Sequence, residues 1–541
     1  MKEILSWLVF GLTVCVMPQV HAHFVWVMRS GDSVYVRFSE SAESTEPELL
    51  KNVAAAKVWA RIPGGRSKAT MQETPLSLAA DSLSAKLDSK ADVVVASHDY
   101  GVVNKGGAAF LLKYLAKQNL SDLPGQWTAV NDPEKLPFEI VPSWKDQSIV
   151  LTVTLSGKPV EGLEVSVAGC GLSETLTTDS QGSVLCQPTE NGVMSVRAKH
   201  VLEQSGELDG RKYDSVRTYS TLTLPISIPS VSPVTHQLPA LPQGITSFGA
   251  AIARDSIYVY GGQFGEAHHY SESGQSGDFL RIAMNAERPQ WEQLEGGPKL
   301  TGLALVEYNG KLYRIGGFTA KNSEDQDQSL WSQSDFARFD PSTGHWEQLP
   351  AMPSGRSSHD AAVMDGKLYV VGGWNMQGAD STTWHTTALV CDLNNPELKW
   401  EELPTPPFQR RAVSLAAFDG RIFVMGGMTE ADSTTTEVAV FDPATGTWSA
   451  APTLLGNGME GFGTSAFAAG DQLVVTTMSG AVQSLSKGAT TWTVAGTAAE
   501  PRFFHRQLTT SSGDILLVGG ASMQTGKTNT VELLRPSGTT R

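Results

Sequence analysis

The apolar runs that decide the fold of the larger part of this chain are "IYVYGG" (257–262), "LYRIGG" (312–317), "LYVVGG" (368–373), "IFVMGG" (422–427) and "ILLVGG" (515–520). The second glycines of the first four runs are 55, 56 and 54 residues apart. A further 53 residues lead to Gly480 in the degraded copy "LVVTTMSG", and 40 more lead to Gly520. A fixed period of about 50 residues, with several short strands in each unit, is typical of a β-propeller.

The segments between these runs indicate the type of repeat from which the propeller is built. "FDPSTGHW" (339–346) and "FDPATGTW" (441–448) are near-duplicates, and turns such as "MDGKLY" (364–369) precede the glycine pairs. These residues resemble kelch repeats over 232–541, and the resemblance implies four-stranded blades with tryptophan between them. Six copies predict a six-bladed kelch β-propeller in an all-β chain. We expect residues near 233–239, with His236 in the tryptophan position, to complete the last blade, so that strands from both ends close the ring.

Composition and the N-terminus limit the possible functions. The chain has 541 residues and a net charge of −15, which argues against binding to nucleic acid or anionic membranes. Residues 1–22, "MKEILSWLVFGLTVCVMPQVHA", have the charged start, short apolar core and small −3 and −1 residues of a signal peptide. Cleavage after Ala22 predicts an exported protein, periplasmic or extracellular. No later stretch is long and apolar enough to span a bilayer, so no integral membrane segment is expected.

The N-terminal half has a different pattern. We expect a β-sandwich domain over 23–142, an immunoglobulin-like β-sandwich and linker over 143–228, and the propeller over 229–541. "GAAFLLKYLAKQNL" (107–120) predicts a helix, and "PISIPSVSP" (225–233) predicts a linker. The Ala-His-Phe-x-Trp start, "FLLKYLAK", "GKPVEG" with "TTDSQG", and the run 196–224 resemble the DUF4198 family of periplasmic domains. That resemblance implies an association with nickel or cobalt uptake.

Three histidines are candidate metal ligands. Cleavage after Ala22 would give His23 a free amine beside its imidazole, a chelate that suits Cu(II) or Ni(II). His98 and His200, both expected at strand ends, are the candidate partners. The alternative is that His23 is an exposed first residue and that the other two are ordinary hydrogen-bonded strand histidines.

Cysteine placement suggests one disulfide. Cys170 and Cys186 flank a predicted hairpin, and an oxidising compartment would permit a bond between them, although the pairing requires a Cα separation that spacing does not fix. Cys391 is expected to be a buried thiol.

Kelch propellers commonly bind partners on the face where the glycine pairs end. Aromatic and arginine side chains favour an anchoring surface there. The alternative is that the arginines belong to the repeat itself, and the loop carrying His268 and His269 is expected to be solvated. The residues expected on this face are Gln263, Phe318, Trp374, Asn375, Arg356, Arg410, Arg411, Arg502 and His505.

Three functions follow from these patterns. The first is an exported binding protein, possessing a copper or nickel site in its N-terminal half, whose propeller docks a protein or glycan. The second is a carbohydrate-active enzyme with its site in the propeller channel, similar to sialic-acid mutarotases or copper-radical sugar oxidases. Against the copper oxidase, Cys391 has no compelling tyrosine partner. The third is an adhesion or scaffold protein.

Overall fold

The computed structural model describes residues 23–64, 68–88, 90–121, 123, 126–145, 148–228, 230–234, 238–378 and 381–537. The predicted signal peptide lies outside these residues. Within them the protein is all-β, and the helical segments are the short 3₁₀ turns η1 (Pro47–Val53) and η3 (Gly458–Gly461). None of the helices in the described ranges has the length and apolar character that crossing a membrane requires.

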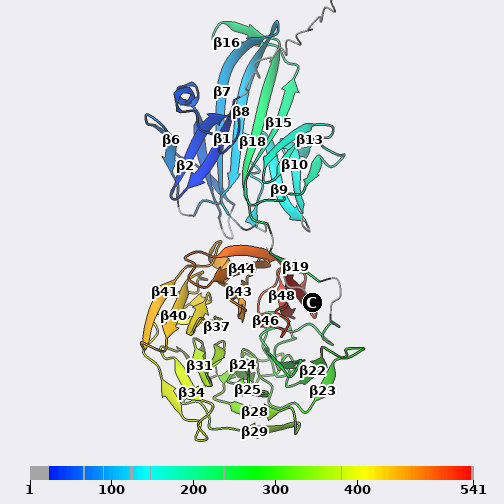
Figure 1. The fold of residues 1–541 in the computed structure, drawn as a ribbon, viewed down its shortest axis with the longest axis vertical. Helices are drawn as coiled ribbons and strands as arrows, with labels where there is room; N and C mark the ends of the chain where they lie inside the picture. Colours follow the sequence, from blue (N-terminus) through cyan, green and yellow to red (C-terminus); the bar gives the residue numbers. More distant parts are fainter. Residues whose placement is uncertain are drawn as a thin grey trace, which may run out of the picture.

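The N-terminal half consists of three stacked sheets and a small hairpin, drawn in the upper part of Figure 1. The first sheet is β1 (Phe24–Ser30), β2 (Ser33–Ser39), β6 (Leu83–Lys86) and β5 (Ser77–Leu78). The central sheet is β13 (Leu172–Thr177), β12 (Glu164–Gly169), β15 (Gly192–Leu202), β18 (Ser215–Ile226), β8 (Ala108–Asn119), β7 (Val93–Lys105), β3 (Lys57–Ile62) and β4 (Thr70–Glu73). The third is β11 (Lys158–Pro159), β10 (Ser148–Leu155), β14 (Ser183–Cys186) and β9 (Phe138–Lys145), and the hairpin is β16 (Gly206–Leu208) with β17 (Arg211–Tyr213).

The middle strands of the central sheet are buried on both faces. Alternate residues of β7 enter different cores: Val94 packs with β1 and β2, whereas Val95 packs with β9 and β10. Successive side chains of a strand point to opposite faces, so one sheet serves two cores. Such a strand reads as a nearly continuous apolar run.

This burial explains why the predicted helix over 107–120 is wrong. The segment is β8, a strand in the middle of the central sheet, antiparallel to β7 and parallel to β18. An apolar run buried on both faces cannot be told from a buried helix by its periodicity. The pairing of β18 with β8 also joins residues 23–142 and 143–228 into one sheet, and β9 spans the boundary expected at 142/143.

The C-terminal region contains six four-stranded antiparallel sheets, arranged around a ring in Figure 1. Five follow chain order, each written from the innermost strand outward. They are β20 (Gly249–Ala253), β21 (Ser256–Tyr260), β22 (Phe279–Ala283), β23 (Glu292–Leu294); β24 (Ala304–Tyr308), β25 (Lys311–Ile315), β28 (Phe336–Asp340), β29 (His345–Gln348); β30 (Asp360–Met364), β31 (Lys367–Val371), β34 (Leu389–Asp392), β35 (Trp400–Glu402); β37 (Ser414–Phe418), β38 (Arg421–Met425), β40 (Val438–Asp442), β41 (Thr447–Ala451); and β42 (Ser465–Ala469), β43 (Gln472–Thr476), β44 (Ala481–Ser486), β45 (Thr493–Thr497).

The sixth sheet uses both ends of the region. It consists of β46 (Arg506–Thr509), β47 (Ile515–Val518), β50 (Val531–Pro536) and β19 (Val231–Pro233). The partner of β50 therefore lies at 231–233, slightly before the expected 233–239, and inside the segment predicted to be a linker. His236 lies outside the described residues.

A glycine pair follows the second strand in five of the six repeats. Gly316 has φ +57, and a Cβ there would lie 2.3 Å from the carbonyl oxygen of Arg356 in the next repeat. Only glycine permits both this backbone conformation and this approach. In five repeats a tryptophan at or just before the outermost strand links neighbouring sheets in the same way: the indole Nε1 of Trp346 donates to Glu295 O at 3.2 Å, and that of Trp448 donates to Pro404 O at 2.7 Å.

Candidate functional site

The three predicted metal ligands are not brought together. Across the central sheet His98 pairs with Tyr114, Tyr114 with Tyr219, and Tyr219 with Lys199. His200, one residue further along β15, is therefore three strand spacings from His98, about 14 Å, and points to the other face. The described residues contain no group of three or more His, Cys, Asp or Glu side chains placed to hold a metal ion.

Each histidine has other contacts. His23 Nε2 is 2.7 Å from Glu46 Oε2, and its ring lies 5.6 Å from that of Phe38. His98 is buried, and burial lowers its pKa. His200 packs against Phe138 in the opposite core, with ring centroids 5.7 Å apart. His98 and His200 therefore cannot both share one ion with His23, and a copper or nickel site that pairs His23 with one of them stays a prediction.

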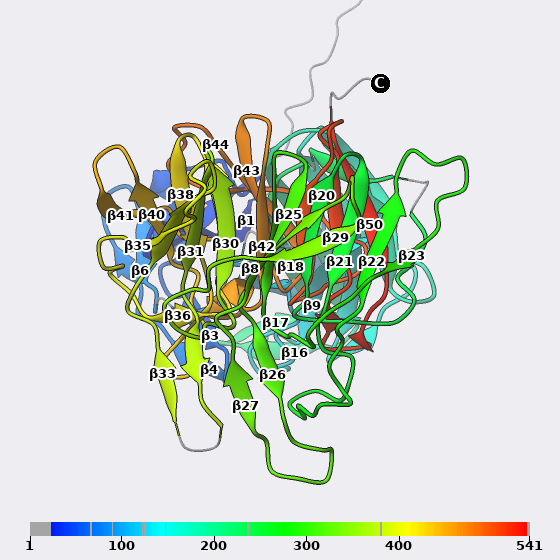
Figure 2. The ribbon, with the colours of Figure 1, turned by 90° about the horizontal axis from the view of Figure 1, so that it is seen from below.

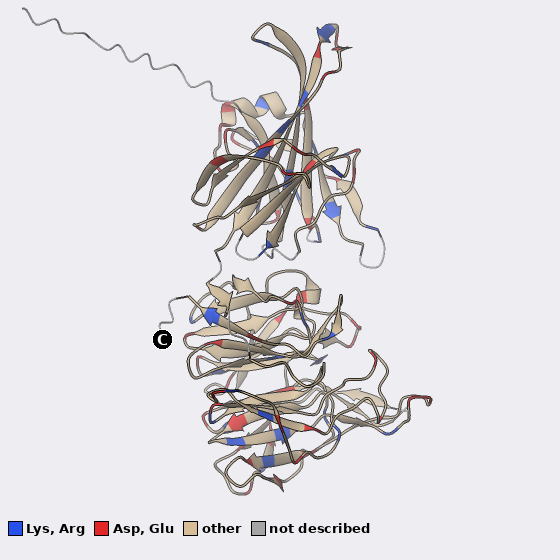
Figure 3. Cartoon of the chain, turned by 90° about the vertical axis from the view of Figure 1, so that its right-hand side faces the viewer, with Lys and Arg blue, Asp and Glu red and all other residues tan. Residues whose placement is uncertain are grey.

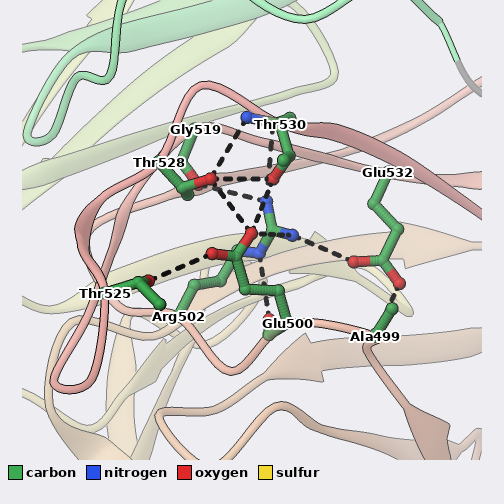
Figure 4. A network of polar contacts seen from close by, with 8 residues as sticks. All are labelled: Ala499, Glu500, Arg502, Gly519, Thr525, Thr528, Thr530 and Glu532. Atoms are coloured by element: carbon green, nitrogen blue, oxygen red, sulfur yellow. Dashed lines mark hydrogen bonds and ion pairs between the residues drawn. The ribbon is translucent and has the colours of Figure 1, made fainter.

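Three of the predicted arginines on the propeller face are structural. Arg356, Arg410 and Arg502 are buried, and each donates from Nη1 to the carbonyl of the first glycine of its own repeat, Gly372, Gly426 or Gly519. Figure 4 shows the surroundings of Arg502, where Glu500 and Glu532 pair with the guanidinium and Thr528 and Thr530 donate to Glu500. Each of these arginines binds groups within its own repeat and is buried there, which corrects its placement on a binding surface.

Gln263, Phe318 and His505 are also buried. Gln263 and Phe318 occupy matching positions after their glycine pairs, where isolated bridges join them to Thr246 and Thr301. Burial keeps the pKa of His505 well below 6.5, and Arg502 and Arg506 lower it further. None of the three presents its side chain to solvent.

The inner strands enclose a channel that is closed by an ion pair. Arg506 on β46 reaches to Asp360 on β30, three sheets away around the ring, with Nη1 2.8 Å from Oδ1. The same guanidinium donates to Phe248 O and Leu303 O, while Asp360 accepts from Leu415 N. On one side of this pair is a cavity of about 330 Å³, and its wall includes eight alanines: Ala250, Ala251, Ala361, Ala362, Ala416, Ala417, Ala466 and Ala468.

Two hairpins project from the ring on one side, as Figure 2 shows for β26, β27 and β33. They are β26 (Phe318–Ala320) with β27 (Leu330–Ser332), and β32 (Trp374–Met376) with β33 (Thr382–Trp384). They lie side by side, because Gly378 N donates to Leu330 O at 2.9 Å and Trp331 bridges to Gln377. Short strands follow two other glycine pairs. β39 (Met428–Thr429) pairs with β36 (Arg410–Arg411), which precedes the innermost strand of its repeat, and β48 (Ala521–Ser522) forms a hairpin with β49 (Gly526–Lys527).

The two large hairpins carry partly exposed tryptophans held by cations. Trp374 and Trp384 face each other across β32 and β33, with ring centroids 5.7 Å apart. The Arg411 guanidinium lies 4.1 Å from the Trp374 ring, and Lys321 Nζ lies 4.2 Å from that of Trp331. We call Trp331, Trp374, Trp384 and Arg411 the hairpin face. Trp374 and Arg411 were predicted from the sequence, and Asn375 lies half-buried beside them.

Sequence reasoning missed Trp331 and Trp384. Both belong to long insertions between the second and third strands of their repeats, outside the repeat pattern. The sequence signal that could have identified them is a tryptophan in an insertion that the other repeats do not share.

A cavity of about 670 Å³ opens beside the first of these hairpins, where the loops following β21 and β26 meet. Its lining includes the carboxylates Glu266 and Glu324 and the aromatic residues Phe264 and Tyr270. Tyr270 also packs on Phe318, with ring centroids 5.3 Å apart. Of the two loop histidines, His269 lines this cavity, and His268 is exposed. Figure 3 marks the positions of acidic and basic residues along the chain, including those in the projecting loops.

Cys170, Cys186 and Cys391 are free, buried thiols in the structure. The predicted disulfide between Cys170 and Cys186 is not formed. Burial raises the pKa of Cys170 to about 11 and that of Cys186 to about 12, which disfavours the reactive thiolate.

Comparison with known proteins agrees with the repeat pattern. The family model of the KLHDC2/KLHL20/DRC7 Kelch-repeats domain matches residues 249–480. Kelch repeat and BTB domain-containing protein 12 of Homo sapiens is 26% identical over 204 residues, which are 36% of this chain and 32% of that protein. Kelch-like protein terF of Aspergillus terreus is 23% identical over 326 residues, 58% of this chain and 68% of its own length.

The human relative is much longer than the matched region, so the chain spans about a third of its length. A solved structure, that of YjhT, covers 55% of this chain and 96% of its own at 18% identity, with a TM-score of 0.45. The family match stops short of the N-terminal half, and its resemblance to the DUF4198 family stays a prediction. The C-terminal region of this chain contains a kelch-repeat domain.

Proposed function

We propose that this protein is an interaction scaffold whose kelch domain docks a protein partner on the hairpin face. The observation that carries the proposal is the group of three partly exposed tryptophans on two adjoining hairpins, with Arg411 of β36 packed on one of them, Trp374. Tryptophan and arginine are the residues most enriched among the energetic anchors of protein interfaces.

The scaffold itself is a six-bladed propeller closed by β19 and β50. Supporting this, each innermost strand contacts the innermost strand of the next sheet, and β46 returns to contact β20. Pairing of β19 with β50 adds the fourth strand of the last blade from the start of the region. Such a closure leaves no open edge between the first and last blades.

The channel favours docking over catalysis. Its charged pair, Arg506 and Asp360, is satisfied internally, and the cavity next to it is lined mainly by apolar side chains, with Glu307 as a further ionisable group. A catalytic site needs acid–base groups that converge on a free space. For this reason we place function on the hairpins, and not in the channel as the carbohydrate-enzyme alternative requires.

Export remains part of the proposal. The residues predicted to form the signal peptide precede His23, and N-terminal sequencing of protein from the natural cells tests whether the mature chain begins there. A protein that retains residues 1–22 would contradict export by this route.

Binding to a purified partner tests the docking proposal. The full-length protein would first be used to isolate partners from its own cells, and the affinity of each would then be measured for the variant Trp384→Ala/Arg411→Ala. We expect a loss of affinity of tenfold or more, since anchors of this kind contribute about 2 kcal/mol or more. The matched control is Leu185→Ala, an exposed apolar residue in the N-terminal half.

Equal affinity of the double variant and the control for every partner would overturn docking at the hairpin face. A glycan array probed with the same proteins separates the partner classes. Binding to glycans that the double variant loses would replace the protein partner by a carbohydrate.

A further inference from the structure

The fifth repeat is the one whose glycine pair is degraded, and its loop surface differs from the others. β43 ends at Thr476 and β44 begins at Ala481, so no hairpin separates them, whereas β25 and β28 of the second repeat are separated by residues 316–335. The space next to this short connection contains a buried carboxylate, Glu460 in η3, which is 3% exposed.

One oxygen of Glu460 organises the repeat itself. Its Oε2 accepts from the hydroxyls of Thr477 and Ser479, at 2.5 and 2.8 Å. Thr477 and Ser479 belong to the sequence that replaces the usual Gly-Gly. The other oxygen, Oε1, accepts from Gln126 Nε2 at 2.7 Å, and Gln126 belongs to the N-terminal half of the chain.

Gln126 is held ready for this bond by its own half. Ser121 Oγ donates to Gln126 Oε1 at 2.8 Å, which leaves the amide nitrogen directed at Glu460. Trp127 Nε1 donates to Ser121 O, and Thr128 N donates to Asn119 Oδ1 at the end of β8. Gln126 is therefore held by bonds within its own segment, which Thr128 anchors to the end of β8.

An apolar contact accompanies the polar one. Leu123 is fully buried, although it lies in a connection between strands. Gly456 has φ +97, and a Cβ built on it would lie 2.7 Å from Leu123 Cδ1 and 2.9 Å from Gln126 Nε2. Glycine at 456 thus permits the close approach of the N-terminal segment. Figure 1 shows the N-terminal half standing over the edge of the ring that carries β43 and β44.

We propose that the loop surface of the fifth repeat is an intramolecular docking site for Leu123 and Gln126, in the connection that follows β8, and that this contact fixes the orientation of the N-terminal half. It is a second attachment, besides the chain connection through β19. The fifth repeat lost its glycine pair and hairpin where this segment binds. A consequence is that the two halves form one composite body, with the hairpins of the second and third repeats left open for a partner.

A charge exchange in the full-length protein tests the contact. Gln126→Glu places two carboxylates against each other, and like charges this close repel. In the double variant Gln126→Glu/Glu460→Gln, the carboxylate stands at position 126 and the carboxamide at position 460, so one group can again donate to the other. The readout is hydrogen–deuterium exchange of the amides at 456–460 and of those in 126–130, together with the radius of gyration from X-ray scattering.

We expect severalfold faster exchange at both segments and a larger radius of gyration for Gln126→Glu, with recovery toward the wild type in the double variant. Thr477→Val is the control for damage inside the repeat, because it removes a bond of Glu460 without touching Gln126; it should speed exchange at 456–460 but not at 126–130. The proposal is overturned if Gln126→Glu leaves both measurements at wild-type values. It is equally overturned if the second substitution gives no recovery while the protein remains folded by circular dichroism.

Discussion

At the scale of single residues, the chemistry of this chain lies mostly inside the propeller. Arg356, Arg410 and Arg502 recur at equivalent positions of their repeats, and their guanidinium groups donate to carbonyls of the glycine pairs. The sequence alone could not separate them from Arg411, which lies next to Arg410 yet packs on Trp374. Neighbouring residues of a strand point to opposite sides, so one is buried and the next is available to a partner.

The ion pair in the channel should contribute strongly to stability. Arg506→Met leaves the nearly buried Asp360 without its partner, and loss of one member of a buried pair costs about 3–5 kcal/mol. Urea denaturation measures the difference. The control is Arg338→Met, whose pair with Glu347 is more exposed and should cost about 1 kcal/mol or less. Similar losses for both variants would contradict a structural role for the channel pair.

Buried histidines should make the protein sensitive to mild acid. Burial lowers the pKa of His359 and His505 well below 6.5 and that of His385 to about 4. The unfolded chain takes up protons near pH 6.5 and the folded chain does not, so the free energy of unfolding should fall as the pH drops below that value. Urea midpoints between pH 7 and about 5 test this. His359→Gln/His505→Gln should flatten the profile, and an unchanged slope would contradict the assignment.

The three thiols should resist modification in the folded state. Burial raises the pKa of Cys391 to about 11, as it does for Cys170. We expect iodoacetamide at pH 8 to label none of the three until denaturant is added, and then to label all of them, as intact mass would show. Labelling of Cys391 alone in denaturant without reductant would reveal a bond between Cys170 and Cys186, contrary to the structure.

At the scale of elements, the glycine pairs are essential because of both conformation and contact. Gly316→Ala forces a positive φ on alanine and pushes a methyl group against the carbonyl of Arg356. Gly446→Ala, in a turn with φ +68 and open space around it, has only the conformational cost. Such strained positions cost about 1–3 kcal/mol each, so Gly316→Ala should exceed Gly446→Ala in urea denaturation. Equal losses would show that the contact is unimportant.

The elements also show where prediction from sequence succeeded. The recurring apolar runs with their glycine pairs indicated the strands of the C-terminal region. Because the pattern recurs six times, an ambiguous helix or strand signal in one copy is resolved by the other copies. β8 was misread, since it occurs once and is buried on both faces. Its Lys117 is fully buried, with Nζ 2.5 Å from Glu139 Oε1.

At the scale of the whole molecule, long-range contacts determine which segments share a sheet and which side chains meet, and the sequence does not reveal these contacts. The joining of 23–142 to 143–228 depends on the parallel pairing of β18 with β8. The separation of His98 from His200 follows from the same strand order, and no spacing along the chain reveals it. Likewise, Gln126 and Glu460 are 334 residues apart in sequence, so their hydrogen bond carries no local signal.

The most direct test of the account is site-specific photocrosslinking in the natural cells. A photoreactive phenylalanine analogue would replace Trp331 or Trp384 on the hairpin face, or Leu185 in the N-terminal half as the control. We predict a discrete protein adduct of higher mass from both hairpin positions, and none from position 185. The absence of any adduct from the hairpin positions, or the same adduct from position 185, would contradict docking at the hairpin face.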